Sequence, residues 1–175
     1  MNVVEPPSAL VAAQAADRLG ALAIPAGALG RLGDLGVWIC ATQGQVPPRE
    51  LTDVRLVIFA GDHGVSAYGV SAYPSEITAA MVRTFVMGKA TVSALSAAHD
   101  VRVRVLDIAV DDDLVGVDPE VGKHKVRRSS GAIHLEDALT EAETRQALDA
   151  GAQVAAEEIA QGAQLLLCGD MGFWA

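Results

Sequence analysis

The sequence predicts an α/β fold in which an N-terminal helical segment precedes part of a Rossmann-like parallel sheet. Short, continuous apolar runs in the chain are typical of strands that are buried on both faces of a parallel sheet. Stretches with three- and four-residue apolar spacing separate these runs, as expected of the helices that connect parallel strands. A break that contains Gly and Pro precedes the first run. We therefore expect a helical segment over residues 1–50 and, over residues 51–175, the truncated first half of a Rossmann-like domain.

The composition limits the partners of this protein. The 175 residues include 13 Lys and Arg against 22 Asp and Glu, a net charge of −9. This balance argues against nucleic acid or a membrane as a partner, because both attract positive charge. No apolar run approaches the roughly 20 residues of a membrane helix, and the first residues lack a secretion signal, so we expect a cytoplasmic protein. Cys40 and Cys168 lie far apart in apolar stretches, which predicts two buried thiols.

Two helices are predicted in the N-terminal segment. The first covers residues 8–22, with Ser8 as its N-cap. A break at residues 24–27 separates it from a second helix over residues 29–42. The face of this second helix that packs inward is expected to be Leu29, Leu32, Leu35 or Gly36, and Ile39. The pair Pro47-Pro48 marks the boundary to the rest of the chain.

The first strand is predicted over residues 56–60, and it stops at the tetrapeptide 61–64, Gly-Asp-His-Gly. Pro74 then opens a helix whose apolar residues recur at three- and four-residue spacing as far as Gly88. A further helical piece over residues 90–98 leads into the second strand.

The second strand is predicted from Val101 to Asp107 or slightly beyond, because β-branched residues alternate there. Thr140 and Glu143 have capping-box spacing and open a long helix. The apolar stripe of that helix is expected to be Leu148, Ala152, Ala155 and Ile159. A third strand follows over residues 164–168, and we expect it to be buried as well.

Polar residues and glycines follow these predicted strands at their carboxyl ends. They are Asp62, His63, Gly64, Asp107, Gly169, Asp170, Met171 and Gly172. In open α/β sheets, ligands bind outside the carboxyl ends of the strands. Glycines let a ligand approach the backbone, and carboxylates accept hydrogen bonds from sugar hydroxyls. The sequence therefore predicts a ligand site along this edge of the sheet.

Asp62 and His63 allow two interpretations. Adjacent residues of an extended chain point to opposite sides, so the two cannot form a catalytic Asp–His pair with each other. One interpretation is a turn aspartate beside a histidine that bonds to nearby backbone. The other is a metal-dependent phosphoesterase, because Gly-Asp-His-Gly is one residue shorter than the Gly-Asp-x-His-Gly motif of those enzymes. An accompanying Asn-His motif does not occur in the sequence, and we predict no metal ligands.

A basic run over residues 123–128 also allows two interpretations. Lysine and arginine side chains bind phosphate, and the hydroxyl and backbone donors of residues 129–131 would add to such a site. More often a run of this kind is a solvated loop, which here would balance the acidic residues before it. A complete P-loop or Gly-x-Gly-x-x-Gly motif does not occur in the chain.

Five segments carry a more specific pattern. Residues 27–32, 57–65, 69–78, 130–133 and 169–172 read GALGRL, VIFAGDHGV, GVSAYPSEIT, SGAI and GDMG. In content and order they resemble the nicotinate-nucleotide–dimethylbenzimidazole phosphoribosyltransferase family of cobalamin biosynthesis, and the matches span nearly the whole chain.

The resemblance implies a reaction and its partners. Members of this family move the phosphoribosyl group of nicotinate mononucleotide onto 5,6-dimethylbenzimidazole, which gives α-ribazole 5′-phosphate and nicotinate. The base attacks C1′ with inversion, and a glutamate takes the proton that the attacking base loses. The resemblance implies no cofactor, no metal and a homodimer.

The resemblance also assigns residues. Ser71, Tyr73 and Met81 are expected to line the slot for the benzimidazole base, and Gly169, Asp170, Met171 and Gly172 to bind the nucleotide. The family has glutamate at Asp170, and it has a phosphate-binding loop where this chain reads Phe173-Trp174-Ala175. Its catalytic glutamate belongs to chain beyond residue 175, so the catalytic residue is unknown here.

Two expectations follow for the 175 residues by themselves. They are expected to lack useful transferase activity, because the family's general base is not among them. The alternative function is that of a noncatalytic folded fragment that self-associates or binds a nucleotide weakly.

Overall fold

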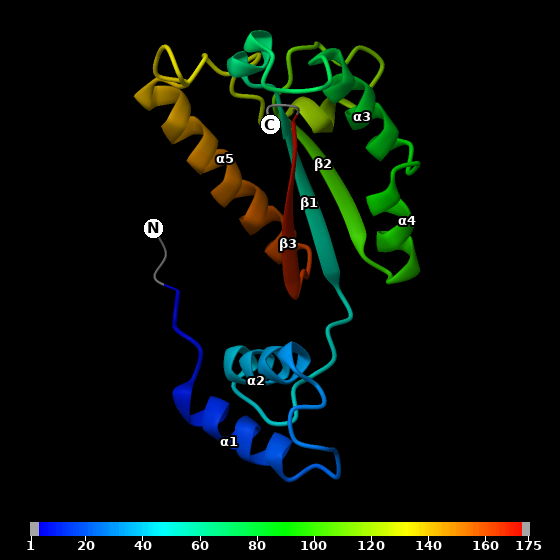
Figure 1. The fold of residues 1–175 in the computed structure, drawn as a ribbon, viewed down its shortest axis with the longest axis vertical. Helices are drawn as coiled ribbons and strands as arrows, with labels where there is room; N and C mark the ends of the chain where they lie inside the picture. Colours follow the sequence, from blue (N-terminus) through cyan, green and yellow to red (C-terminus); the bar gives the residue numbers. More distant parts are fainter. Residues whose placement is uncertain (1–3, 173–175) are drawn as a thin grey trace. The chain divides into compact units, whose positions relative to one another are not determined.

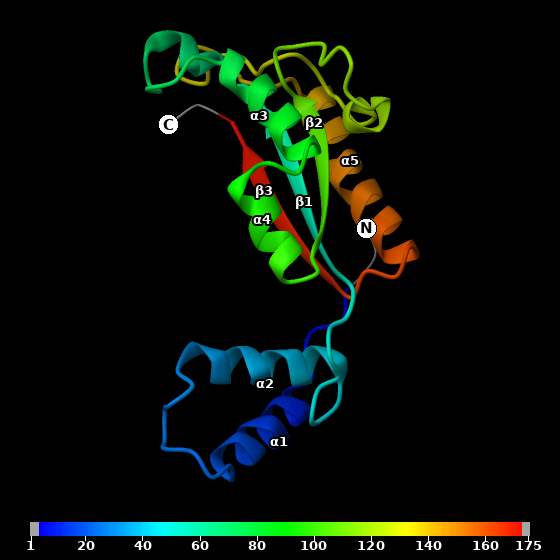
Figure 2. The same cartoon turned by 90° about the vertical axis from the view of Figure 1, so that its right-hand side faces the viewer.

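The computed structural model describes residues 4–172. By its internal contacts the chain divides into two compact units, Met1–Leu51 and Thr52–Ala175. Each is described by itself, and Figures 1 and 2 show the elements of both.

The N-terminal unit contains α1 (Ala9–Gly20) and α2 (Arg31–Gln43). Ser8 caps α1 as predicted, since its hydroxyl accepts the backbone N–H of Val11 at 3.3 Å. Gly44, with a φ of +68°, ends α2 in the left-handed conformation that glycine adopts without strain.

The contact between α1 and α2 differs from the predicted leucine face. The buried residues of the two helices are Ala15, Gly33, Cys40 and Ala41. A Cβ on Gly33 would lie 3.1 Å from Leu19 Cδ2, so glycine permits the close approach. Leu29, Leu32 and Leu35 are 42%, 68% and 47% exposed. The predicted leucine face was therefore wrong, because small residues form the contact between the two helices.

The second unit is a three-stranded parallel sheet with helices on both faces, which confirms the predicted fold class. Its strands are β1 (Val54–Gly61), β2 (Arg102–Ala109) and β3 (Leu165–Met171). Its helices are α3 (Glu76–Val86), α4 (Thr91–Ala98) and α5 (Glu141–Ala160), with short 3-10 turns η1 (Gly64–Tyr68) and η2 (Pro119–Gly122). The strand order is β2-β1-β3. Figures 1 and 2 show α5 on one face of the sheet and α3 with α4 on the other.

Side chains of the central strand alternate between two cores. Ala60 packs with Val82 and Val105 on the side of α3, whereas Val57 packs with Leu106 and Val154 on the side of α5. Because β1 is covered on both faces and paired along both edges, it positions the residues that follow Gly61.

Two predictions about burial were wrong. Leu167 and Cys168 of β3 are exposed, and β3 pairs with β1 alone among the described strands, so it lies at an edge of the described sheet. In α5 the buried residues are Ala150, Val154 and Glu158, while Leu148 and Ile159 are 71% and 62% exposed. The Cys40 thiol is buried as predicted.

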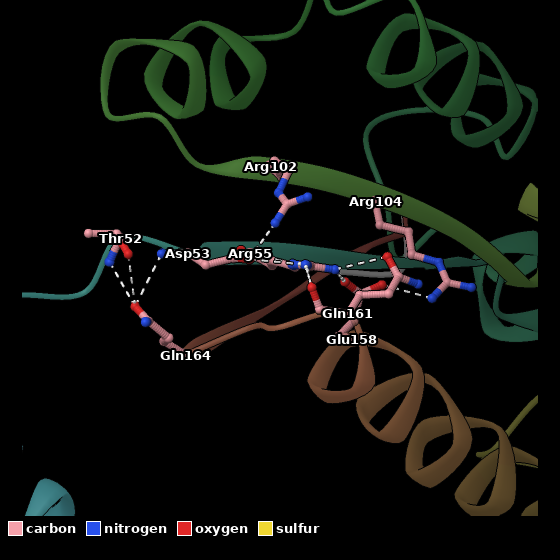
Figure 3. A network of polar contacts seen from close by, with 8 residues as sticks. All are labelled: Thr52, Asp53, Arg55, Arg102, Arg104, Glu158, Gln161 and Gln164. Carbon is pink, nitrogen blue, oxygen red and sulfur yellow. Dashed lines mark hydrogen bonds and ion pairs between the residues drawn. The ribbon is translucent and has the colours of Figure 1, made fainter.

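Glu158 faces the sheet because it pairs with a buried arginine (Figure 3). Arg55 of β1 is 4% exposed, and it donates to Glu158 at 2.7 Å and to Asp53 at 3.0 Å. Arg104 of β2 donates to the other oxygen of Glu158 at 2.8 Å. This network ties α5 to β1 and β2 through ion pairs where a purely apolar stripe was predicted.

Candidate functional site

The tetrapeptide that follows β1 is held by a second segment of the chain. Asp62 N–H donates to Ala109 O at 3.0 Å, Ser130 N–H donates to Asp62 O at 2.9 Å, and Gly64 N–H donates to Ser130 O at 3.0 Å. His63 and Ser130 form a parallel bridge. We call these contacts the 62–130 clasp. It extends β1 beyond its end and joins two of the sequence segments that carried the resemblance.

Glycine at position 64 is required by this clasp. A Cβ there would lie 2.6 Å from Ser130 O and 2.9 Å from Gly131 C. Both are backbone atoms, which cannot move aside as the end of a flexible side chain can. Gly64 therefore supports the site structurally, by letting two backbones approach.

Two buried aspartates stand at the ends of β1 and β2. Asp62 is 3% exposed, and its Oδ2 accepts the backbone N–H of Asp111 at 2.8 Å. Asp107 is 2% exposed and pairs with Lys125 at 2.8 Å. Burial raises the pKa of Asp107, against the lowering effect of Lys125. The lysine also donates to Val110 O and Asp112 O, so it fixes the acidic turn after β2.

The basic run 123–128 balances the acidic residues before it, as the solvated-loop interpretation expected, and its cations are already paired within the chain. Lys125 is engaged as described, Arg127 donates to Glu143 at 3.1 Å, and Arg128 pairs with Asp111 and Asp113 at 3.0 Å. His124 is buried. Through these ion pairs the run, which is part of the loop between β2 and α5, holds that loop against the acidic residues of β2, of the turn after β2 and of α5.

A cavity of about 310 Å³ lies at the carboxyl ends of β1 and β3. Its walls include five of the predicted residues, namely Asp62, His63, Asp170, Met171 and Gly172, together with Arg127 and Ser130. In a sheet of order 2-1-3, strands 1 and 3 flank the point where the chain changes direction, and ligands bind there. The order β2-β1-β3 places this cavity at that switch point.

A second cavity, of about 260 Å³, lies between the sheet and the pair α3–α4. It is mostly apolar, with Ile58, Met81 and Phe85 in its wall, and it also includes Gly169 and Asp170. Asp170 is therefore common to the second cavity and to the first, which we call the strand-end cavity. Met81, predicted to touch a base, and Gly169, predicted to touch a nucleotide, line the same space.

Ser71 and Tyr73 are not part of either wall. They belong to the segment between η1 and α3, which lies at the carboxyl end of the sheet (Figure 1). Ser71 Oγ accepts the N–H of Tyr73 at 3.2 Å, and the Tyr73 side chain is 58% exposed. Their role in base binding stays a prediction. Residues 173–175 lie outside the described residues.

His63 is half-buried in the wall of the strand-end cavity. Burial lowers the pKa of its imidazole from 6.5, while the carboxylates of Asp62 and Asp170 act in the opposite direction. The ring is therefore neutral near pH 7. Within residues 4–172, groups of three or more His, Cys, Asp or Glu side chains arranged to hold a metal ion are not found.

The sequence placed Lys125, Arg127 and Ser130 only in a possible phosphate site. It did not indicate that Arg127 and Ser130 line this cavity, that Lys125 pairs with Asp107, or that the backbone of Asp111 donates to Asp62. The sequence offered one signal for them: a basic run and a Ser-Gly pair follow β2. It did not show which strand end they approach.

A family model described as "Phosphoribosyltransferase" matches residues 4–174. The chain belongs to this phosphoribosyltransferase family. Over 169 residues it is 54% identical to a nicotinate-nucleotide–dimethylbenzimidazole phosphoribosyltransferase of Mycolicibacterium paratuberculosis and 49% identical to one of Mycobacterium leprae, with 97% of this chain and 48% of each relative covered. The chain spans about half the length of the curated relatives it matches.

Solved structures agree with this membership. The crystal structure of the nicotinate-nucleotide–dimethylbenzimidazole phosphoribosyltransferase from Thermus thermophilus superposes on this phosphoribosyltransferase chain with a TM-score of 0.86 at 41% identity, covering 95% of this chain and 50% of that one. The family suggested by the sequence segments is thus confirmed. None of the helices in the described part of the chain is long and apolar enough to cross a membrane.

Proposed function

We propose that these residues supply part of a nicotinate-nucleotide–dimethylbenzimidazole phosphoribosyltransferase, which acts as a homodimer in the cytoplasm. The observation that carries this proposal is the pair of cavities that share Asp170 at the end of β3. The strand-end cavity has the carboxylates of Asp62 and Asp170 in a wall that is otherwise largely apolar, and these carboxylates suit the hydroxyl groups of a sugar. The second cavity is apolar and suits an aromatic base. We take the substrates, nicotinate mononucleotide and 5,6-dimethylbenzimidazole, from the names of the relatives.

In the proposed reaction a ring nitrogen of the base attacks C1′ of the nucleotide. The bond from C1′ to the nicotinate ring breaks, nicotinate leaves with the electron pair, and the attacking base loses its remaining N–H proton to a general base. We assign that general base to none of the residues 4–172. Holding two reactants in line accounts for a large part of the rate of such a transfer, and the two cavities on either side of Asp170 supply that alignment.

The proposed roles follow from the walls. Met81, with Ile58 and Phe85, contacts the apolar base. Asp62, His63 and residues 170–172 surround the sugar in the strand-end cavity. Ser71 and Tyr73 approach the base from the segment after η1.

A chimera tests the proposed function. Residues of this chain replace the matching 169 residues of the M. paratuberculosis relative, and nicotinate release and α-ribazole phosphate formation are measured. We expect activity within about tenfold of the unmodified relative, since one factor of ten is only ~1.4 kcal/mol of transition-state stabilisation. A folded chimera without turnover would contradict the proposal, with the unmodified relative as control.

The 175-residue polypeptide by itself is expected to release nicotinate far more slowly than the chimera. Loss of general-base assistance alone costs about 10²–10⁴-fold in rate. Turnover of the polypeptide at the rate of the chimera would show that the general base lies among these residues.

A further inference from the structure

The guanidinium of Arg127 has one nitrogen that is anchored and one that is accessible. Nη1 donates to both carboxylate oxygens of Glu143, at 3.1 and 3.2 Å. Nη2 makes no hydrogen bond within residues 4–172 and, unlike Nε, it is not one of the buried polar atoms that lack a partner there. The side chain as a whole is 33% exposed. Nη2 is therefore a donor that a ligand can reach, on a guanidinium that Nη1 holds in place.

Glu143 is itself fixed, so the start of α5 determines where Arg127 lies. The Glu143 carboxylate accepts the backbone N–H of Thr140 at 2.8 Å and the Thr140 hydroxyl at 2.9 Å, within the capping box. These two bonds, together with Arg127, hold the pKa of Glu143 below its usual 4.5. Glu143 is therefore charged near pH 7 and keeps its hydrogen bonds to Arg127. The capping box of α5 thus also positions a cation.

The surroundings of Arg127 favour a ligand that has both an apolar body and a negative charge. The strand-end cavity, of about 310 Å³, is lined mainly by apolar side chains such as Phe59, Ile108 and Ala147. Glu143 and Ala147 lie one turn apart on α5, so Arg127 reaches the cavity from the side of α5. An aromatic ring that bears a carboxylate suits an apolar wall with one accessible guanidinium nitrogen. A phosphate in the same place would leave charged oxygens without donors, which is costly.

We propose that Nη2 of Arg127 donates to the carboxylate of the nicotinate ring, and that the apolar wall of the strand-end cavity holds the ring itself. This inference rests on the proposed function. The ring of nicotinate mononucleotide is joined to C1′, so a ring bound on the side of α5 leaves the sugar near Asp170 at the end of β3. Arg127 therefore holds the leaving group in line with C1′, and the attacking base enters from the second cavity.

The experiment compares nicotinate mononucleotide with nicotinamide mononucleotide, which has the same phosphate but a neutral amide in place of the carboxylate. Calorimetry measures the binding of both to the 175-residue chain and to its Arg127→Gln variant. We expect the unmodified chain to bind the amide form about tenfold more weakly, because a hydrogen bond between charged groups is worth more than one to a neutral group. In Arg127→Gln the two affinities are expected to lie within about threefold of each other.

Arg128→Gln is the matched control. Arg128 pairs with Asp111 and Asp113 and is not in the wall of the strand-end cavity. This variant loses the same charge and is expected to keep the tenfold difference. A further variant, Ala147→Leu, narrows the apolar wall and leaves Arg127 and its partner unchanged. It is expected to weaken the binding of both nucleotides by about fivefold or more. Circular dichroism checks that each variant is folded.

Each other outcome overturns the inference. If the unmodified chain binds both nucleotides equally, it does not recognise the ring carboxylate, although the proposed function stands. If Arg127→Gln weakens both by the same factor, Arg127 contacts the phosphate instead. If the preference persists in Arg127→Gln, is also lost in Arg128→Gln, or if Ala147→Leu binds as the unmodified chain does, the ring is not held as proposed. If the chain binds neither nucleotide while the chimera is active, the strand-end cavity is not a nicotinate site in this chain.

Discussion

At the residue scale, two glycines of this protein matter because they let other parts of the chain approach the backbone closely. Gly64 and Gly131 have no side-chain chemistry, yet a Cβ on either would lie within 3 Å of other atoms. Gly64 lets the turn over residues 61–64 lie against residues 130–131, and Gly131 lets that second segment lie against residues 136–138.

Gly64→Ala is expected to destabilise the sheet unit by about 1–3 kcal/mol, because the new methyl group collides with fixed backbone in the clasp. Urea unfolding followed by circular dichroism measures the change. Gly122→Ala is the matched control, since a Cβ at that position meets nothing within 4 Å. Equal stability of the two variants would mean that the 62–130 clasp does not constrain the native structure.

His63 offers a pH-dependent prediction. Burial lowers the pKa of its imidazole below 6.5, and the carboxylate of Asp170 partly offsets that effect. Removing this carboxylate with Asp170→Asn is expected to lower the pKa further, since the charged imidazole loses a favourable neighbour. NMR titration of the ring measures it in both proteins. A higher pKa in the variant would contradict the assigned contribution of Asp170.

At the scale of elements, an ion-pair network joins α5 to the sheet at the end opposite the candidate site (Figure 3). Arg55 and Glu158 are both nearly buried, so each would be an uncompensated charge without the other. The network fixes the rotation of α5 about its axis, and with it the side that faces β1 and β2.

Glu158→Gln is expected to destabilise the sheet unit by about 1–3 kcal/mol, because the charged hydrogen bonds from Arg55 and Arg104 are weakened while both arginines stay in place. Denaturant unfolding provides the measurement. Glu141→Gln is the control on the same helix. It breaks an exposed pair with Arg145, which is worth no more than about 0.5 kcal/mol. An equally small effect at Glu158 would show that the pair is not part of what holds α5.

The same network predicts loss of stability in acid. Hydrogen bonds from Arg55 and Arg102 lower the pKa of Asp53 from 3.8 to about 2, and those from Arg104 and Lys123 lower that of Glu157 from 4.5 to about 2. Because these pKa values are lower in the folded protein, the unfolded chain takes up protons at a higher pH than the folded chain does. The stabilisation of the fold by these two carboxylates is therefore complete above about pH 5 and is lost as the pH falls from about 5 to about 2.

Denaturant midpoints measured across this range test the sign, and Glu157→Gln is expected to flatten the decline. Asp107 has the opposite effect on stability. Because burial raises its pKa in the folded protein, its contribution to the free energy of unfolding falls as the pH rises. Stability that increases as the pH drops from about 5 to about 3 would mean that groups such as Asp107 outweigh the network.

At the scale of the whole molecule, both units leave apolar surface uncovered among the described residues. Leu32 and Trp38 of α2 are 68% and 50% exposed, and Leu167 of β3 is 42% exposed. The outer edge of β3 pairs with no described strand. Exposed edges and apolar patches favour association.

The 175-residue polypeptide is therefore expected to self-associate, and light scattering at increasing concentration measures its mass. Leu167→Lys places a charge on the edge strand and is expected to shift the mass toward the monomer. A constant monomeric mass of the unmodified polypeptide at high concentration would contradict the expectation.

The order of the strands and long helices followed from the sequence alone, and so did the choice of the sheet edge at which we place the candidate site. Alternation and run length identified the strands, and Thr140 with Glu143 formed the predicted capping box. Such signals are local, because they depend on the spacing of residues within one element. The glycines and carboxylates at the strand ends were also visible, and a parallel sheet brings its strand ends to one edge.

Only the tertiary structure decided which faces are covered and which charges pair. Leu148 and Ile159 looked like a core stripe, but Arg55 on a distant strand required Glu158 to face the sheet instead. The basic run was expected to bind phosphate or to balance the acidic residues before it, and only the fold showed that Asp107, Glu143 and Asp111 are its partners. Burial and ion pairing depend on residues far apart in the chain, and a pattern within one segment carries no information about a partner that only folding brings near.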